Sequence, residues 1–256
     1  MPDVSDANAT QVPESDSVEE FGYRQELRRS LGFKELLVYG MLFMVPTAPM
    51  GVYGLVSQAA PGQVPLVYLV GVLAMLFTAI AFRNLSAAFP IAGSVYAYVQ
   101  RGLNPHVGFV GGWLILLDYL MVPSLLYAFV GAWLHGLYPP IPAWIYVAAI
   151  IVAITSLNVL GITITARANW ILFGLQILVL LAFVGTALLW LLSRGDAGAS
   201  LSRLWRPGPV DLGVIGAASS TAVLSYLGFD GISTLAEEAK DPRRNVGRAI
   251  MACLLL

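Results

Sequence analysis

Two acidic residues stand inside long apolar runs of this sequence, and they are the first candidates for chemistry. Asp118 follows the apolar segment 113–117, WLILL, and Asp230 lies between Gly228 and Gly231. Removal from water disfavours the charged form of a carboxyl group. An acid held in apolar surroundings is therefore suited to bind and release a proton. Asp230 is the first candidate for that role and Asp118 the second, with a purely structural hydrogen bond as the alternative for each.

The other residue types that serve catalysis or metal binding are scarce. The sequence contains one cysteine, Cys253, and two histidines, His106 and His135. A single cysteine excludes an internal disulfide and a cysteine-based metal cluster. Neither of the hydrolase motifs HExxH and GxSxG occurs, and no basic patch points to nucleic acid. We expect no enzyme activity, no cofactor, no metal and no nucleic-acid partner.

The elements that must position the two acids are membrane spans. Of 256 residues, 58% are apolar and 11% are charged, against about 25% charged in soluble domains. A helix that crosses the hydrocarbon core needs about 20 apolar residues. Six segments meet that need, and a seventh apolar run from Ala249 reaches only Leu256, so we expect a chain cut within its seventh span. The six segments are 36–58, 64–82, 107–134, 143–161, 169–192 and 212–235.

The basic residues predict the orientation of these spans. If the N-terminus is cytoplasmic, the outer segments hold three basic residues, Arg194, Arg203 and Arg206, of the 14 in the chain. Inner loops carry the excess of Lys and Arg in membrane proteins. We therefore expect a multi-pass protein of the cell membrane with its N-terminus inside. Residues 1–33 form a polar, mostly disordered cytoplasmic tail, and residues 194–211 form an outer loop.

Two of the six spans carry residues that interrupt helices. The first contains the segment 45–51, VPTAPMG, whose prolines remove two backbone donors and clash with the preceding turn. The sixth contains the segment 225–231, SYLGFDG, in which glycines flank an acid. A simple proline kink and a continuous glycine-packed helix are the respective alternatives. Two broken helices in oppositely oriented units are typical of inverted-repeat secondary transporters.

Two parts of the sequence resemble the amino acid–polyamine–organocation permease family. They are the segment 89–98, FPIAGSVYAY, and the segment 225–231, SYLGFDG, followed by 237–245, EEAKDPRRN. The segment 104–109, NPHVGF, together with LDYL at 117–120, looks like the putrescine-importer branch of that family. The resemblance implies an all-α, LeuT-like fold of two inverted five-helix repeats with discontinuous helices 1 and 6. Residues 34–193 would form the first repeat, and residues 212–256 would form helix 6 and a truncated helix 7 of the second.

The resemblance also implies secondary transport of amino acids or polyamines, by proton symport or by exchange, through the lipid bilayer. In amino acid carriers of the family, free amides at the first break hold the substrate carboxylate. Pro46 and Pro49 remove two such amides here, which favours a diamine or another substrate with few carboxylates. Tyr119 would line the site by resemblance to the putrescine branch, and Glu237 would offer an anion to an ammonium group. The remaining expected substrate-binding residues are Thr47, Ala48, Met50, Gly51, Ser225, Tyr226, Gly228 and Phe229.

A membrane protein without transport activity, such as a seven-helix receptor or sensor, is the alternative to a transporter. A retinal-binding receptor would need a lysine within a span, and the two lysines, Lys34 and Lys240, both lie outside the expected spans. A channel has no evident need for two opposed helix breaks. The transporter interpretation is therefore preferred.

Overall fold

The computed structural model of this protein describes residues 21–22, 27–160, 162–194 and 211–256, and the side chains of 162–167 and 194 are left out of the description. The expected disordered tail and outer loop fall mainly on residues outside these ranges, so both stay predictions. Every regular element in the described part of the chain is helical. A single parallel bridge joins Leu31 to Ala239.

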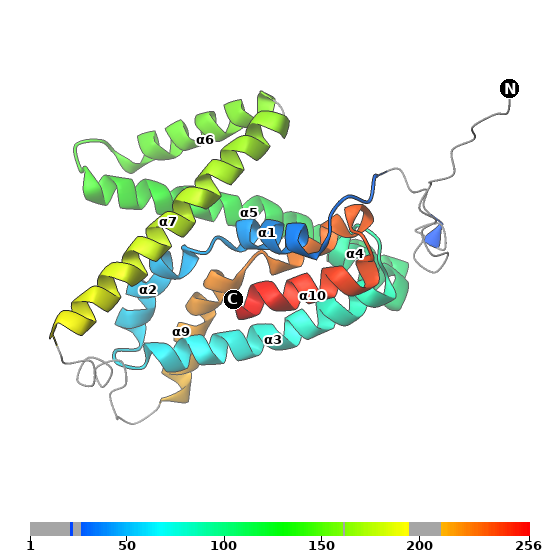
Figure 1. Cartoon of the computed structure of the whole chain (residues 1–256), viewed down its shortest axis with the longest axis horizontal. Helices are drawn as coiled ribbons and strands as arrows, with labels where there is room; N and C mark the ends of the chain where they lie inside the picture. Colours follow the sequence, from blue (N-terminus) through cyan, green and yellow to red (C-terminus); the bar gives the residue numbers. More distant parts are fainter. Residues whose placement is uncertain (1–20, 23–26, 161, 195–210) are drawn as a thin grey trace, which may run out of the picture.

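Figure 1 shows the helices in chain order, from α1 near the N-terminus to α10 at the C-terminus. In the described part of the chain, α3, α5, α6 and α7 are longer than 15 residues. The elements are α1 Phe33–Met44, α2 Ala48–Ala59, α3 Val64–Ala88, α4 Ser94–Gly102, α5 Pro105–Leu137, α6 Ala143–Val159, α7 Ile162–Arg194, α9 Leu212–Ala222, the 3-10 helices η3 Val223–Tyr226 and η4 Phe229–Glu238, and α10 Pro242–Leu255.

Four helical segments are long and apolar enough to cross a membrane: Val64–Ala88, Pro105–Leu137, Ala168–Ser193 and Leu212–Glu238. The bent pair α1 and α2 makes a fifth if it is counted as one span. The remaining expected span, α6, is a shorter apolar helix of 17 residues, at the lower limit for crossing the hydrocarbon core. The described residues thus form a multi-pass helical membrane protein, and the count of six spans stays a prediction.

The first span is interrupted, as the sequence predicts. α1 ends at Met44, α2 begins at Ala48, and the two helices are bent by 42°. Pro46 lies in the interruption and cannot donate to a continuing helix. Pro49 lies in the first turn of α2, where the missing N–H costs little because the first amides of a helix have no partner within it.

The sixth span is interrupted as well, and the break is centred on glycine. α9 ends at Ala222, and the tighter turns of η3 follow to Tyr226. Leu227 is then extended, and Gly228 has a left-handed backbone with φ of 105°. Residues with a Cβ rarely adopt that conformation. Both predicted interruptions are therefore confirmed, whereas the two-repeat symmetry stays a prediction.

Side chains of α1, α3, η4 and α10 form the main core. A second buried cluster joins α2, α3 and α9 through Val56, Val67 and Ile215. α10 begins at Pro242, seven residues before the expected apolar run at Ala249, because proline is well suited to the first position of a helix. The early start lets α10 lie along α3 in the bundle (Figure 1).

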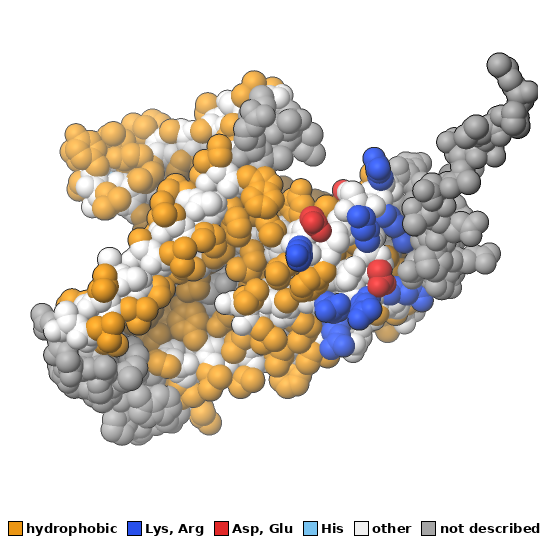
Figure 2. Space-filling view, viewed as in Figure 1, with side chains coloured by type: hydrophobic (Ala, Val, Ile, Leu, Met, Phe, Trp, Pro, Cys, Tyr) orange, Lys and Arg blue, Asp and Glu red, His pale blue; other side chains and the backbone are white. Residues whose placement is uncertain are grey.

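Helices α5, α6 and α7 form an arm beside this bundle (Figure 1). α5 packs on α4 and on α6, and α6 packs on α7. The arm is apolar over much of its surface, as the space-filling view shows (Figure 2). Helices that are apolar on all sides are typical of surroundings made of lipid or of further helices.

Candidate substrate site at the two helix breaks

The two helix breaks lie against each other. A Cβ atom at Gly228 would lie 2.5 Å from the carbonyl oxygen of Phe43, near the end of α1. A Cβ atom at Gly231 would lie 2.9 Å from the ring of the same phenylalanine. Real Cβ atoms are almost never this close to backbone atoms, so only glycine allows the sixth span to approach the first so closely. The interrupted segments thus share one location in the fold.

Both acids singled out by the sequence lie near this location together with Tyr119. The Asp118 carboxylate interacts electrostatically with that of Asp230, and Tyr119 interacts with both. Backbone amides of the second break, including those of Gly228 and Gly231, also interact with the Asp230 carboxylate. Two acids and a phenol of α5 and the sixth span thus lie within electrostatic range of one another. Such a group is suited to bind a cation or to share a proton.

Ser225 and Tyr226 lie just before the second break. Ser225 is buried, and its hydroxyl has no hydrogen-bond partner among the described residues. A buried polar group without a partner carries a desolvation cost, which a polar ligand could remove. Tyr226 donates a hydrogen bond of 3.3 Å to the backbone oxygen of Tyr68. Tyr68 in turn donates one of 3.4 Å to the backbone oxygen of Pro49.

Tyr68 therefore connects the two breaks, although nothing in its sequence context distinguishes it from an ordinary aromatic residue of an apolar helix. Its ring packs edge-on against that of Tyr226 at 6.4 Å between centroids. Trp133 of α5 was not anticipated either. Its ring lies where a side chain at Gly51 would stand, with 2.6 Å between the nearest ring carbon and an added Cβ.

The expected residues of the first break differ in their surroundings. Thr47 stands at the N-cap of α2, with no side-chain hydrogen bond to the helix, and Ala48 is the first residue of that helix. Met50 is exposed, and Gly51 packs against Trp133. These four residues lie together at the start of α2, on the segment that follows the interruption.

Two expected site residues make their contacts elsewhere. Phe229 is 2% exposed and packs edge-on against Phe82 in the main core. Glu237 lies at the end of η4 and accepts a hydrogen bond of 3.1 Å from the backbone N–H of Ala92. Both residues thus make contacts that stabilise the fold, and their roles in substrate binding stay predictions.

Among the residues that the structure describes, no group of three or more His, Cys, Asp or Glu side chains could hold a metal ion. The carboxyl groups of Asp118 and Asp230 and the buried hydroxyl of Ser225 are among the polar groups near the breaks. This arrangement suits reversible binding of a small polar or cationic molecule.

Comparison with known proteins identifies the family of this chain. The sequence pattern of the family described as "Amino acid permease" matches residues 36–256. This chain belongs to the amino acid permease family. A seven-helix receptor or sensor is accordingly not favoured.

The names of individual relatives of this permease-family chain describe transporters of small molecules. The low-affinity putrescine importer PlaP of Escherichia coli is 34% identical over 237 residues, which cover 91% of this chain and 52% of PlaP. The branched-chain amino acid permease BcaP of Bacillus subtilis is 26% identical over 253 residues, with coverage of 91% and 52%. The methylthioribose transporter of Bacillus subtilis is 24% identical over 250 residues, covering 90% and 52%. The chain spans about half the length of the curated relatives it matches.

The two segments that carry the family resemblance contact each other in this permease-family chain. Beside the hydrogen bond from Ala92 to Glu237, the hydroxyls of Ser94 and Ser233 lie 2.9 Å apart. Tyr98 of α4 is almost fully buried, packs against Phe82, and has its pKa raised to about 12 by burial. The loop between α3 and α4 and the start of α4 are thus held against η4 by hydrogen bonds.

Proposed function

We propose that this protein is a secondary transporter that takes its substrate where the two helix breaks meet, and that Asp230 carries the coupling proton. The observation that supports the proposal best is the grouping of Asp118, Tyr119 and Asp230 beside the break at Gly228. A transporter needs a site that both sides of the membrane can reach in turn, and interrupted helices supply such sites near the bilayer midplane. Charged residues at that depth are costly and mark substrate or proton pathways.

The substrate that fits these residues best is a diamine or another cationic amine. Two carboxylates can each accept hydrogen bonds from an ammonium group. Pro46 and Pro49 have no backbone N–H, so the first break offers two fewer amide donors to a substrate carboxylate. The name of the putrescine importer PlaP, at 34% identity, supports the same class of substrate. Amino acids are the second class, supported by the name of the relative BcaP.

Coupling by Asp230 leads to a direct test in the full-length protein, reconstituted in vesicles with an imposed pH gradient. Asp230→Asn mimics the permanently protonated acid and removes proton release. We expect uphill accumulation of putrescine to fall to the level of passive equilibration. Exchange of internal for external substrate should persist, because exchange needs no proton release.

Asp211→Asn is the matched control. Asp211 caps α9 by accepting hydrogen bonds from the N–H groups of Gly213 and Val214, and asparagine caps helices equally well. That variant should accumulate substrate normally. Ordinary pH-driven accumulation by Asp230→Asn would refute the coupling role. If Asp230→Asn fails to reach the membrane, Asp230→Glu, which keeps a titratable carboxyl group, should still accumulate substrate with a shifted pH profile, and an unshifted profile would refute the role equally.

A further inference from the structure

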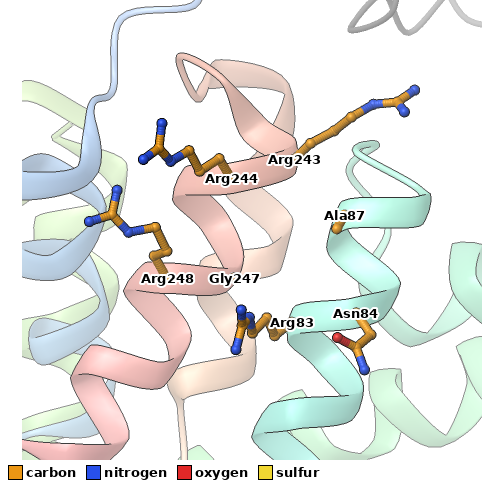
Figure 3. A pocket seen from close by; sticks show the side chains of 7 residues that line it. All are labelled: Arg83, Asn84, Ala87, Arg243, Arg244, Gly247 and Arg248. Atoms are coloured by element: carbon orange, nitrogen blue, oxygen red, sulfur yellow. The ribbon is translucent and has the colours of Figure 1, made fainter.

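We propose that a basic hollow between α3 and α10 binds the headgroup of an anionic phospholipid. The hollow has a volume of about 630 Å³, and arginines of both helices surround it (Figure 3). None of its lining residues belongs to either helix break, so the proposal does not depend on the substrate or on the coupling ion. The lining residues on which the argument depends are Arg83 and Asn84 of α3 and Arg243, Arg244, Gly247 and Arg248 of α10.

Close packing of the two helices holds the arginines in place. A Cβ atom at Gly247 would lie 2.7 Å from Cγ of Arg83 and 3.1 Å from its backbone oxygen. α10 therefore packs directly on the backbone of α3 at this point. Figure 3 shows Arg244 and Arg248 projecting from successive turns of α10, with Arg83 below Gly247. The hollow is thus built from elements of the main core.

Three arginines of the hollow have no carboxylate partner in the described part of the chain. Arg83, Arg244 and Arg248 form no ion pair with a carboxylate of a described residue. Arg248 instead lies over the ring of Phe33, at 5.2 Å from its centroid. Lys and Arg also gather on this end of the molecule in the space-filling view (Figure 2). Arginine binds phosphate oxygens in pairs through its planar fork, so the hollow is chemically suited to a phosphate group.

The position of Arg83 along its helix places the hollow at the level of lipid headgroups. Arg83 follows Val64, the first residue of α3, by a rise of about 28 Å at 1.5 Å per residue. That length is close to the roughly 30 Å thickness of a hydrocarbon core. If α3 spans the bilayer from Val64, Arg83 reaches the opposite interface. Basic hollows between helices at that depth are typical sites for anionic lipid headgroups.

An adjoining apolar hollow favours a lipid over free phosphate. This second hollow, of about 350 Å³, shares Arg83 and Arg248 with the first and continues along Phe33, Met251 and Ala252. A phosphate ion would use the arginines alone. A phospholipid would use both hollows, with its phosphate at the arginines and the start of an acyl chain along the apolar side chains.

The test uses the full-length protein purified in a neutral detergent, with thermal unfolding as the measurement. Three probes are compared: short-chain phosphatidylglycerol, short-chain phosphatidylcholine and inorganic phosphate. We expect phosphatidylglycerol alone to raise the unfolding temperature at concentrations well below its critical micelle concentration. Phosphatidylcholine lacks the net charge, and inorganic phosphate lacks the acyl chain.

A double variant, Arg83→Gln with Arg248→Gln, should bind phosphatidylglycerol roughly 20–30-fold more weakly, at about fivefold per arginine. Arg28→Gln removes the same charge outside the hollow and should leave the affinity unchanged. Equal affinity in the double variant would overturn the proposal. Equal stabilisation by inorganic phosphate would also overturn it, in favour of a small-anion site. If the double variant does not fold, the wild-type comparison of the three probes decides by itself.

Discussion

The two helix breaks reach a similar result by different means. The first depends on Pro46, which cannot continue the ladder of α1, and on Val45, whose backbone is held at φ of 54°. The second contains no proline and depends on Gly228 at φ of 105°. The first interruption is favoured by the local sequence, because Pro46 lacks the N–H that a continuing helix requires. The second depends on its neighbour, because Gly228 lies directly against the backbone of Phe43.

This difference indicates that the breaks are not interchangeable. The first is a local property of the chain, and the second is a fit between two spans. Changes that add atoms at the second break should therefore have larger effects on the fold than changes of proline at the first. The following substitutions test that ordering in the full-length protein, from the largest expected effect to the smallest.

Gly228→Ala should have the largest effect. The substitution forces a left-handed backbone on alanine and drives its Cβ atom into the carbonyl of Phe43. We expect a loss of roughly 2–4 kcal/mol in stability, measured as a lower unfolding temperature, together with loss of transport. Gly216→Ala is the control, because Gly216 lies on α9 of the same span and nothing lies within 4 Å of an added Cβ. Equal stability of the two variants would contradict the dependence of the second break on the first.

Pro49→Ala should change substrate preference more than stability. Pro49 lies in the first turn of α2, where alanine preserves the helix and restores one free N–H beside the break. We expect binding of an amino acid carboxylate to improve about fivefold, for one added hydrogen bond of about 1 kcal/mol. Putrescine binding should not change.

Pro65→Ala is the control for this substitution, because Pro65 holds the same position in the first turn of α3. Competition of labelled substrate by an amino acid and by putrescine measures both affinities. If Pro65→Ala and Pro49→Ala shift amino acid affinity equally, or neither shifts it, the prolines of the first break do not exclude carboxylates.

Val45→Asn should have the smallest effect. A β-branched residue with positive φ is strained, and asparagine tolerates this region better. We expect a gain in stability of up to about 1 kcal/mol, seen as a small rise in unfolding temperature. Val52→Asn is the contrasting variant, because Val52 is buried within α2 and asparagine there should destabilise the protein. A loss of stability in Val45→Asn would show that the first break depends on packing of this side chain more than on backbone conformation.

Most of the helices could be predicted from the sequence because their signals are local. Apolar length predicts the extended helices, and both interruptions follow from glycine and proline. The ends of helices were harder to predict. α3 continues to Ala88, six residues beyond the expected end at residue 82. The apolar run marks the part of a helix that suits the hydrocarbon core of the membrane, and the helix can extend past it.

The site was predictable in its composition and not in its contacts. The sequence by itself determined that Asp118 and Asp230 stand in apolar surroundings and that the first and sixth spans are interrupted. Only the tertiary structure decided that the acids share one location, that Tyr68 connects the breaks, and that Phe229 turns into the core. The physical reason is that the polarity of a residue is a property of the chain, whereas its neighbours depend on how helices distant in sequence pack together.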